Sequence, residues 1–374
     1  MIRRTLILGA VAFLGSNAEA GVYGPEDVSP FAIRPDGTAE ELPYVPNFKS
    51  MLDDRLNAGN PKAPLEENGK PTYRGRLVQR VETLWPSGGF TSRIPASVSG
   101  LSLDRQVDLA ADMIRLGRAD DAVALLQPRA RDRNPDFKAL VTLSQAYAAR
   151  GEWDSAIQTH ADAFELAPRP VTLPGANAAQ TKWVLEVEKG FVARWLALRK
   201  AEAASREPVE THDLLGLFPV RFVNDKGEYQ PGTLAAAEKA KLRPDAVAIV
   251  QQLLLWSPDD PRLLWLLAEL TAAAGRLREA AEIFDQCTWG RGFTNRKKLM
   301  DHRTAVATAA NAQPAPKSDD VPLETDTPKP ADKPATDDFL PSTTTILLVS
   351  VVFGGIVALL LALQLRAVLR RMRR

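Results

Sequence analysis

The side chains best suited to acid–base or metal chemistry are three histidines, His160, His212 and His302, and they are scattered along the chain. Only His212 has close acidic neighbours, Glu210 and Asp213, and these three residues could in principle form one metal cluster. We interpret them as the charges of a surface loop, and His160 as a packing or surface residue. The histidines therefore predict no catalytic triad and no metal site.

The other reactive groups lead to the same expectation. Cys287 is the only cysteine, so the chain has no internal disulfide and no cysteine-based structural zinc site, and we expect it to be buried as a small apolar side chain. No glycine-rich loop of the phosphate-binding kind is present. Three pairs of carboxylates are placed at turns or helix starts, where capping explains them: Asp120-Asp121, Asp259-Asp260 and Asp319-Asp320. The sequence thus predicts no catalytic residue and no cofactor.

The elements that carry these side chains repeat with a period of 34 residues. Gly117 and Gly151 are separated by this period, and three other pairs of similar residues have the same separation: Leu109 and Leu143, Ala110 and Ser144, and Ala122 and Ala156. A period of this length, with a glycine between two apolar helical patterns, predicts a tandem repeat of helix pairs. Two antiparallel helices that cross closely need small side chains at the crossing, and neither helix buries its apolar stripe alone.

These residues resemble the tetratricopeptide repeat family. The second copy carries nearly the whole pattern, with Leu140, Leu143, Ser144, Tyr147, Gly151, Trp153, Ala156, Ala163 and Pro168. The first copy matches at Leu109, Ala110, Met113, Gly117, Ala122 and Pro135, with Arg129 where a small residue is usual. A further copy has Leu264, Leu267, Ala268, Gly275, Ala280, Phe284 and Cys287, and a degenerate one precedes it, with its first helix around Thr233–Lys241 and Ala246, Val250, Leu253 and Pro258 in its second.

The resemblance implies an α-solenoid with a concave face that binds a protein or peptide. The side chains implied for that face are Val141, Thr142 and Gln145 in the second copy and Arg262, Trp265 and Glu269 in the last. Family members that bind chaperones hold a peptide carboxylate with lysine and asparagine at these positions. This chain has Val141, Thr142 and Gln145 instead, so no such clamp is expected, and Trp265 is the best single anchor.

Two segments interrupt the repeats. Residues 21–98 form an arm rich in proline and glycine, in which we predict at most two helices, Asn47–Asn57 and Tyr73–Leu84. Residues 171–226 form an insert between repeats, for which the apolar spacing predicts a long helix, Trp183–Glu207. After it, Phe218–Val223 and Glu228–Gln230 surround a turn sequence and predict a small β-hairpin.

Both ends of the chain have the composition of membrane-targeting segments. Residues 1–20 carry two arginines, a short apolar run and Ala18-Glu19-Ala20, which predicts a cleaved signal peptide. Residues 345–365 are long and apolar enough for a transmembrane helix, and the arginine-rich tail 366–374 predicts that the C-terminus is cytoplasmic. The bulk of the chain then lies outside the cytoplasm.

The expected membrane helix has two further features. Ser350, Gly354, Ala358 and Ala362 recur every four residues and could bring two such helices together, which makes a homodimer an expectation. The segment Leu340-Pro341-Ser342-Thr343-Thr344 resembles the LPXTG sorting signal of sortase substrates, although Thr344 replaces the glycine at which cleavage is favoured. We therefore expect an intact membrane anchor.

The domain organisation follows from these boundaries. After the signal peptide and the arm, residues 99–170 hold two repeats, the insert follows, and residues 227–310 hold the degenerate repeat, the last full repeat and a capping helix. Residues 311–341 are a proline-rich mixture with few bulky apolar side chains, which predicts a disordered stalk. The expected fold is all-α: a tetratricopeptide-like solenoid with an irregular arm, a hairpin insert and one transmembrane helix.

Charge and composition narrow the function. Without the two terminal segments, 40 basic and 45 acidic residues remain, so a basic surface for nucleic acids is not expected. The absence of Asn-x-Ser/Thr sequons favours a bacterial envelope. We expect a membrane-anchored scaffold in the periplasm or at the cell exterior that binds another envelope protein or peptide. Two alternatives stay open: a hydrolase with its site in the arm or in residues 169–227, and a self-associating spacer.

Overall fold

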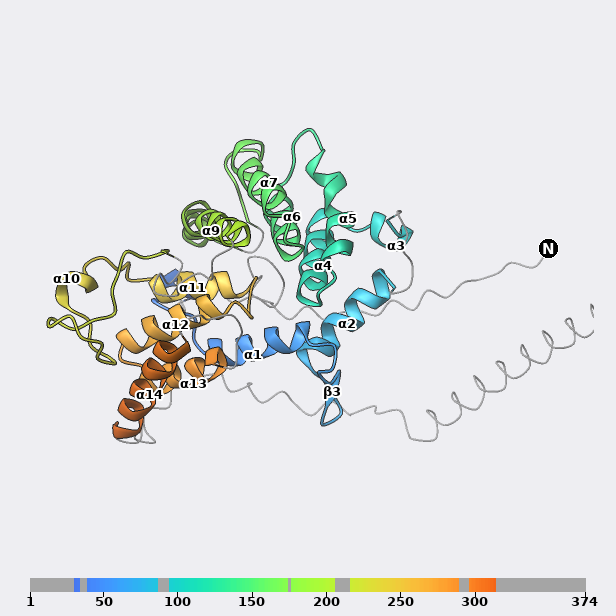
Figure 1. The fold of residues 1–374 in the computed structure, drawn as a ribbon. Helices are drawn as coiled ribbons and strands as arrows, with labels where there is room; N and C mark the ends of the chain where they lie inside the picture. The colour runs from blue at the N-terminus through green and yellow to red at the C-terminus, as the bar shows by residue number, and fades with distance from the viewer. Residues whose placement is uncertain are drawn as a thin grey trace, which may run out of the picture. The chain divides into compact units, whose positions relative to one another are not determined.

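Paired helices form most of the structure, a computed structural model (Figure 1). The structure describes residues 30–33, 39–86, 94–173, 176–205, 216–288 and 296–313. The helices are α1 (Phe48–Gly59), α2 (Tyr73–Leu84), α3 (Ala96–Ser99), α4 (Leu103–Arg115), α5 (Ala119–Ala130), α6 (Phe137–Ala149), α7 (Trp153–Glu165), α8 (Ala178–Val187), α9 (Ala193–Ala204), α10 (Ala236–Lys239), α11 (Ala246–Leu254), α12 (Pro261–Ala273), α13 (Leu277–Thr288) and α14 (Arg296–Ala312). The strands are β1 (Phe31–Ile33), β2 (Ala39–Glu41), β3 (Glu66–Glu67) and β4 (Lys70–Pro71), and the π-helical segment η1 (Glu188–Val192) joins α8 to α9.

Several expectations lie outside the described residues. These are the signal peptide, the stalk beyond residue 313, the membrane helix with its small-residue face, the sorting-like motif, the arginine tail and the group around His212. Within the part of the chain that the structure describes, no helix is both long enough and apolar enough to cross a bilayer.

The three segments predicted as complete repeats are helix pairs that share several features, α4–α5, α6–α7 and α12–α13. In each pair the turn after the first helix contains a glycine with positive φ: 73° at Gly117, 75° at Gly151 and 83° at Gly275. The following residue then donates its N–H back to the helix, as Glu152 does to the carbonyl of Tyr147 at 2.9 Å. Glycine reverses the chain here because a side chain strains this backbone conformation. The predicted turns are confirmed.

Small side chains sit where the paired helices cross, as the period predicts. Ala110 and Ala122 are fully buried in the first pair, and Ser144 and Ala156 in the second. The hydroxyl of Ser144 donates to the carbonyl of Ala156 at 2.8 Å, which ties α6 to α7. A larger residue at either position would separate the two backbones.

The arm is more ordered than its composition predicts. Both predicted helices are present as α1 and α2, and the strands form two separate antiparallel pairs, β1–β2 and β3–β4. Leu52, Leu77 and Val81 are almost fully buried, and α2 packs against α4. The two helices predicted for the arm are therefore confirmed, and each carries buried apolar side chains, whereas Leu65 between them is 44% exposed.

The predicted insert helix is present and longer at its N-terminus. It begins at Ala178 because Asn177 and Gln180 form a reciprocal capping box, with hydrogen bonds of 2.9 Å in both directions. The helix runs through η1 to Ala204, and α9 packs on α7. Trp183 and Trp195 lie on its buried face.

The predicted hairpin between residues 218 and 230 is wrong. Two backbone hydrogen bonds close the turn, from Asn224 N–H to the carbonyl of Glu228 at 2.8 Å and from Gly227 N–H to the carbonyl of Asn224 at 2.9 Å, and no strand forms on either side. The backbone groups before the turn form hydrogen bonds with other segments. Arg221 N–H donates to the Glu238 carboxylate at 2.9 Å, and the carbonyl of Val223 accepts from Ala235 N–H at 2.8 Å. These partners in the α10 region outcompete strand pairing.

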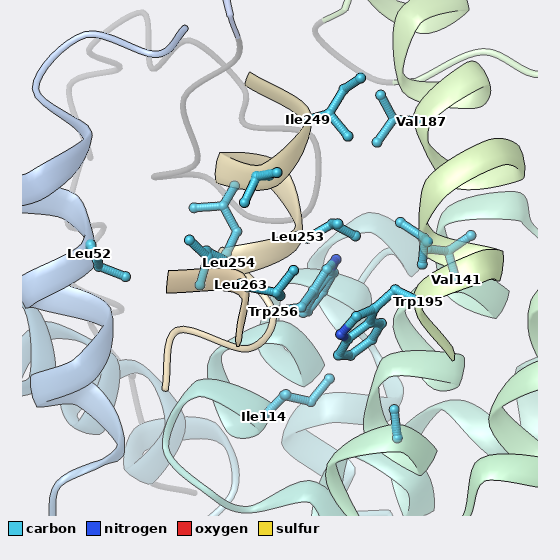
Figure 2. Packing of buried hydrophobic residues seen from close by; sticks show 14 of the residues in the cluster. Leu52, Ile114, Val141, Val187, Trp195, Ile249, Leu253, Leu254, Trp256 and Leu263 are labelled. Atoms are coloured by element: carbon cyan, nitrogen blue, oxygen red, sulfur yellow. The ribbon is translucent and has the colours of Figure 1, made fainter. Parts of the chain in front are cut away.

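The segment predicted as a degenerate repeat differs from the three helix pairs. Its first helix is reduced to the four residues of α10, whereas every residue of its second helix, α11, is buried. In Figure 2, Ile249 and Leu253 of α11 face Val187 and Trp195 of the insert helix, and Leu52 of α1 lies on the other side. The core of the protein is thus centred on α11.

Candidate functional site

The side chains that the resemblance implies for the concave face are buried. Val141 and Gln145 on α6 are 0% and 2% exposed, and Trp265 and Glu269 on α12 are each 2% exposed. Arg262 is also mostly covered, with 11% of its side chain exposed. Val141 lies near the helix that carries Trp195 in Figure 2, within the core around α11. A partner would reach these side chains only if that packing opened.

The buried residues Glu269 and Trp265 belong to a polar cluster with Tyr229 and His302, which are partly buried. The Glu269 carboxylate accepts hydrogen bonds from Trp265 Nε1 at 2.8 Å and from the Tyr229 hydroxyl at 3.0 Å, and it lies 2.5 Å from Nδ1 of His302. The Tyr229 and His302 rings stack with centroids 3.6 Å apart. Burial, together with the charge of Glu269, raises the pKa of Tyr229. The cluster ties the loop after residue 216 to α12 and α14.

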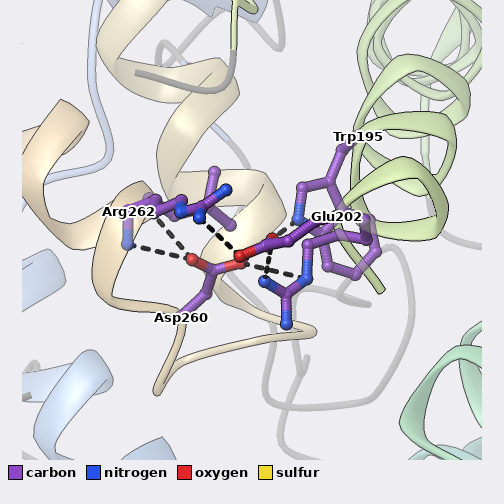
Figure 3. A network of polar contacts seen from close by, with 6 residues as sticks. Trp195, Glu202, Asp260 and Arg262 are labelled. Carbon is purple, nitrogen blue, oxygen red and sulfur yellow. Dashed lines mark hydrogen bonds and ion pairs between the residues drawn. The ribbon is translucent and has the colours of Figure 1, made fainter. Parts of the chain in front are cut away.

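A second cluster joins the insert helix to α12 (Figure 3). Asp260 caps α12 through the N–H of Arg262 at 3.0 Å and also accepts a hydrogen bond from Trp195 Nε1 at 3.4 Å. Glu202 on α9 pairs with Arg199 at 2.7 Å and with Arg262 at 2.5 Å. The capping role predicted for Asp260 is present, and the same carboxylate holds two distant helices together.

His160 meets a carboxylate that its sequence position does not indicate. Its Nε2 lies 2.9 Å from Oε2 of Glu188, and the two residues are 3% and 0% exposed. Burial raises the pKa of Glu188 to about 8 and lowers the pKa of His160 to about 4. Burial thus favours the uncharged form of both groups at this contact. A substrate has no route to either side chain.

The feature best suited to a ligand is a cavity of about 800 Å³ where α1, the end of α4, the α11–α12 connection and α13 meet. Its floor contains buried residues, among them Arg55, Arg115 and Trp256, whereas its rim includes the exposed residues Asn60 and Ala149. This size lies within the range of about 300–1,000 Å³ that is usual for ligand pockets. The cavity is our candidate functional site.

Two arginines in the lining contact aromatic rings. Arg55 is 2% exposed, and its guanidinium lies over the ring of Tyr73, 4.6 Å from the centroid. Arg115 ends α4 and lies over Trp256 at 5.9 Å, with Nη1 3.6 Å from Oδ1 of Asp112. Aromatic faces attract guanidinium groups and help to fix their orientation.

No protein-family model matches the chain, and comparisons with curated proteins and with solved structures find no match either.

The sequence did not indicate the residues that line the cavity. Arg55 lies in a predicted helix, where an arginine normally faces solvent, and Arg115 lies in the first repeat. The only local signal is that Arg55 shares a helix face with Leu52, which is buried.

Neither the cysteine nor a metal cluster adds a site among the described residues. Cys287 is buried, its thiol contacts the carbonyl of Pro261 at 3.1 Å, and burial raises its pKa. No group of three or more His, Cys, Asp or Glu side chains in the described ranges is placed to hold a metal ion.

Proposed function

We propose that the protein is a membrane-anchored envelope scaffold that binds or organises another protein or peptide, and that it is not an enzyme. Its helix pairs are, in this proposal, tetratricopeptide-like repeats. The support is their shared design: a crossing lined with small residues, and a glycine of positive φ after the first helix of each pair. Scaffolds of this kind present a surface and not a reaction centre.

The scaffold acts outside the cytoplasm. Residues 1–20 support export, and residues 345–365 with the arginine tail 366–374 support a single C-terminal span with a cytoplasmic end. The segment 311–341 would then act as a spacer that lets the folded part reach a partner at some distance from the bilayer.

The observation that carries the binding function is the cavity. Its exposed rim opens onto a buried floor, whereas the side chains implied for the concave face are packed inside the protein. The clusters around Glu269 and Glu188 hold their ionisable groups against one another in the core. Binding at the cavity therefore fits the structure better than catalysis at either cluster.

Site-specific photo-crosslinking in intact cells tests this function. A photoreactive residue is placed at the rim, at Asn60 or at Ala149, and a control is placed at Asp225, which is exposed in the loop between α9 and α10. We expect a discrete adduct with another protein from both rim positions and none from the control. The absence of an adduct from either rim position would overturn the proposal.

A further inference from the structure

A second hollow, of about 790 Å³, is formed where the end of α7 meets the insert helix, and we call it the α7–α8 groove. Its lining begins at Phe164 in the last turn of α7, includes the described part of the connection to α8, and continues along one face of α8 to Lys189 in η1. It shares no lining residue with the cavity proposed for protein binding. Its volume lies within the range of about 300–1,000 Å³ that is usual for small-molecule sites.

The groove has an apolar wall, to which Phe164, Val171 and Leu185 contribute. The ring of Phe164 packs against two other rings: its centroid lies 5.2 Å from that of Phe137 and 5.4 Å from that of His160. Because these contacts hold the ring in place, the wall is formed before a ligand binds, and little ordering opposes binding. A ligand with an apolar group would remove this wall from water.

The charged side chains of the groove are mostly cationic. Among the described lining residues, Arg169, Lys182 and Lys189 are basic and exposed, and Glu186 is the only acid. Glu186 lies 4.0 Å from the ammonium of Lys182 and 3.8 Å from the guanidinium of Arg243, so two cations share its charge. Arg169 donates to a backbone carbonyl of α7, which leaves its formal charge in place, and no carboxylate of the described residues pairs with Lys189. The lining therefore favours an acidic ligand.

One ligand has to match both the apolar wall and the cations. An inorganic anion would pair with the cations but leave Phe164 and Leu185 in contact with water. An extended peptide needs hydrogen-bond partners for its backbone, and the neutral polar side chains of the described lining are only those of Thr172 and Thr181. An alkyl chain needs no such partners. A molecule with one alkyl chain and one acidic head therefore fits the groove best.

We propose that the α7–α8 groove binds a free fatty acid. The carboxylate of the fatty acid pairs with the three cations of the lining, and its alkyl chain packs against the apolar wall. This inference goes beyond the proposed scaffold function and does not depend on it. It also gives the insert a role of its own, because α8 lies outside the helix pairs.

A fluorescence titration of the full-length protein in nanodiscs of zwitterionic lipid tests the proposal. An environment-sensitive dye is attached at Thr172→Cys, because Thr172 is exposed in the lining and the native Cys287 is buried. The same dye at Asp225→Cys, in an exposed loop, reports partition of the ligand into the lipid. The ligands are octanoate, its neutral amide octanamide, and butyrate, at neutral pH. We expect octanoate to bind at least about tenfold more tightly than octanamide, which lacks the charge, and than butyrate, which lacks half of the chain.

Exposed lysines provide a matched pair of variants. The double variant Lys182→Gln/Lys189→Gln should reduce the preference for octanoate over octanamide to less than about threefold, because only Arg169 then remains to pair with the carboxylate. The control is Lys226→Gln/Lys239→Gln, since both lysines are exposed and lie outside the groove. It should keep the full preference.

Three results would overturn the inference. They are equal affinity for octanoate and octanamide, equal affinity for octanoate and butyrate, and a preference for octanoate that survives in the Lys182→Gln/Lys189→Gln protein. The first two are measured with all the lysines in place, so an unstable variant does not prevent a decision.

Two competitors test the other possible occupants of the groove. They are phosphatidylglycerol, included in the nanodiscs, and an acetylated peptide amide of alternating glutamate and leucine. Octanoate should stay bound in the presence of either one. Displacement by phosphatidylglycerol would assign the groove to a lipid of the bilayer, displacement by the peptide would assign it to an acidic polypeptide, and either result would contradict the proposal.

Discussion

The side-chain amide of Gln251 binds both backbone groups of Val45, a residue 206 positions earlier in the chain. Its Oε1 accepts a hydrogen bond from Val45 N–H at 2.6 Å, and its Nε2 donates to the Val45 carbonyl at 3.3 Å. Both residues are almost fully buried. The amide of a helix in the core thus completes the hydrogen bonding of an extended segment of the arm, and this pairing fixes the arm to the repeats.

Removal of this amide should destabilise the fold. Gln251→Leu keeps the side chain's approximate volume but leaves a buried N–H and a buried carbonyl without partners, which should cost about 2–4 kcal/mol of unfolding free energy. Gln252→Leu is the matched control, because Gln252 is equally buried and its Nε2 has no hydrogen-bond partner among the described residues. The control should change stability by less than about 1 kcal/mol. Urea denaturation measures both, and equal losses would contradict the pairing.

Two helix-capping aspartates should contribute different amounts to the free energy of unfolding, because only one of them also joins distant helices. Asp136 caps α6 through Ala139 N–H at 2.9 Å, so Asp136→Ala should cost about 1 kcal/mol. Asp260 caps α12 and in addition accepts from Trp195, so Asp260→Ala should cost about 2–4 kcal/mol. Chemical denaturation of the two variants gives the comparison. If both lose the same stability, the contact between α9 and α12 adds nothing.

The buried Glu188 should make stability depend on pH. Its pKa is raised from 4.5 to about 8, so the folded protein holds a proton that the unfolded chain has lost, and stability falls as pH rises from about 4.5 through 8. Glu188→Gln keeps a hydrogen-bond donor for His160 but cannot ionise, so its advantage over the unmodified protein should grow across this window. His160 is present in both proteins. Its lowered pKa makes the folded state less stable as pH falls below 6.5, and this effect is common to both.

Thermal denaturation of both proteins at pH 5, 7 and 9 checks this expectation. The difference in melting temperature between the variant and the unmodified protein should be smallest at the lowest pH and largest at the highest. A difference that is constant over the three pH values would show that Glu188 ionises as readily in the folded protein as in the unfolded chain.

Substitution by alanine should destabilise the protein at one glycine and stabilise it at another. Gly151 has a φ of 75°, so Gly151→Ala strains the turn of the second pair and should cost about 1 kcal/mol. Gly190 lies in the helical segment η1, and nothing surrounds the position of an added methyl group within 4 Å. Gly190→Ala should therefore stabilise the protein by about 0.5–1 kcal/mol. Two variants that shift the denaturation midpoint in the same direction would contradict this interpretation.

What the sequence predicted well is local in origin. The three helix pairs follow from a period shared by neighbouring residues, and α1, α2 and the insert helix follow from apolar spacing. In each case the pattern lies within one or two helices. The prediction of a hairpin was wrong because the turn residues are present but the backbone beside them forms hydrogen bonds with Glu238 and Ala235.

What the sequence did not predict depends on contacts between distant segments. The apolar run Ala246–Leu254 fits a second helix of a repeat equally well whether it lies at an end or at the centre of the core. Nothing beside Gln251 indicates Val45, and nothing beside Arg55 indicates Arg115. The burial of Val141 and Gln145 follows from this central position, because a repeat pattern contains no information about what covers its surface.

The central position of α11 is the claim on which the cavity and the buried concave side chains depend, and hydrogen–deuterium exchange measures it most directly. The amides of Ala246–Leu254 should exchange with the slowest group in the protein, more slowly than those of the short helix Ala236–Lys239. If the two segments exchange at similar rates, α11 does not lie at the centre of the core and this account of the fold is wrong.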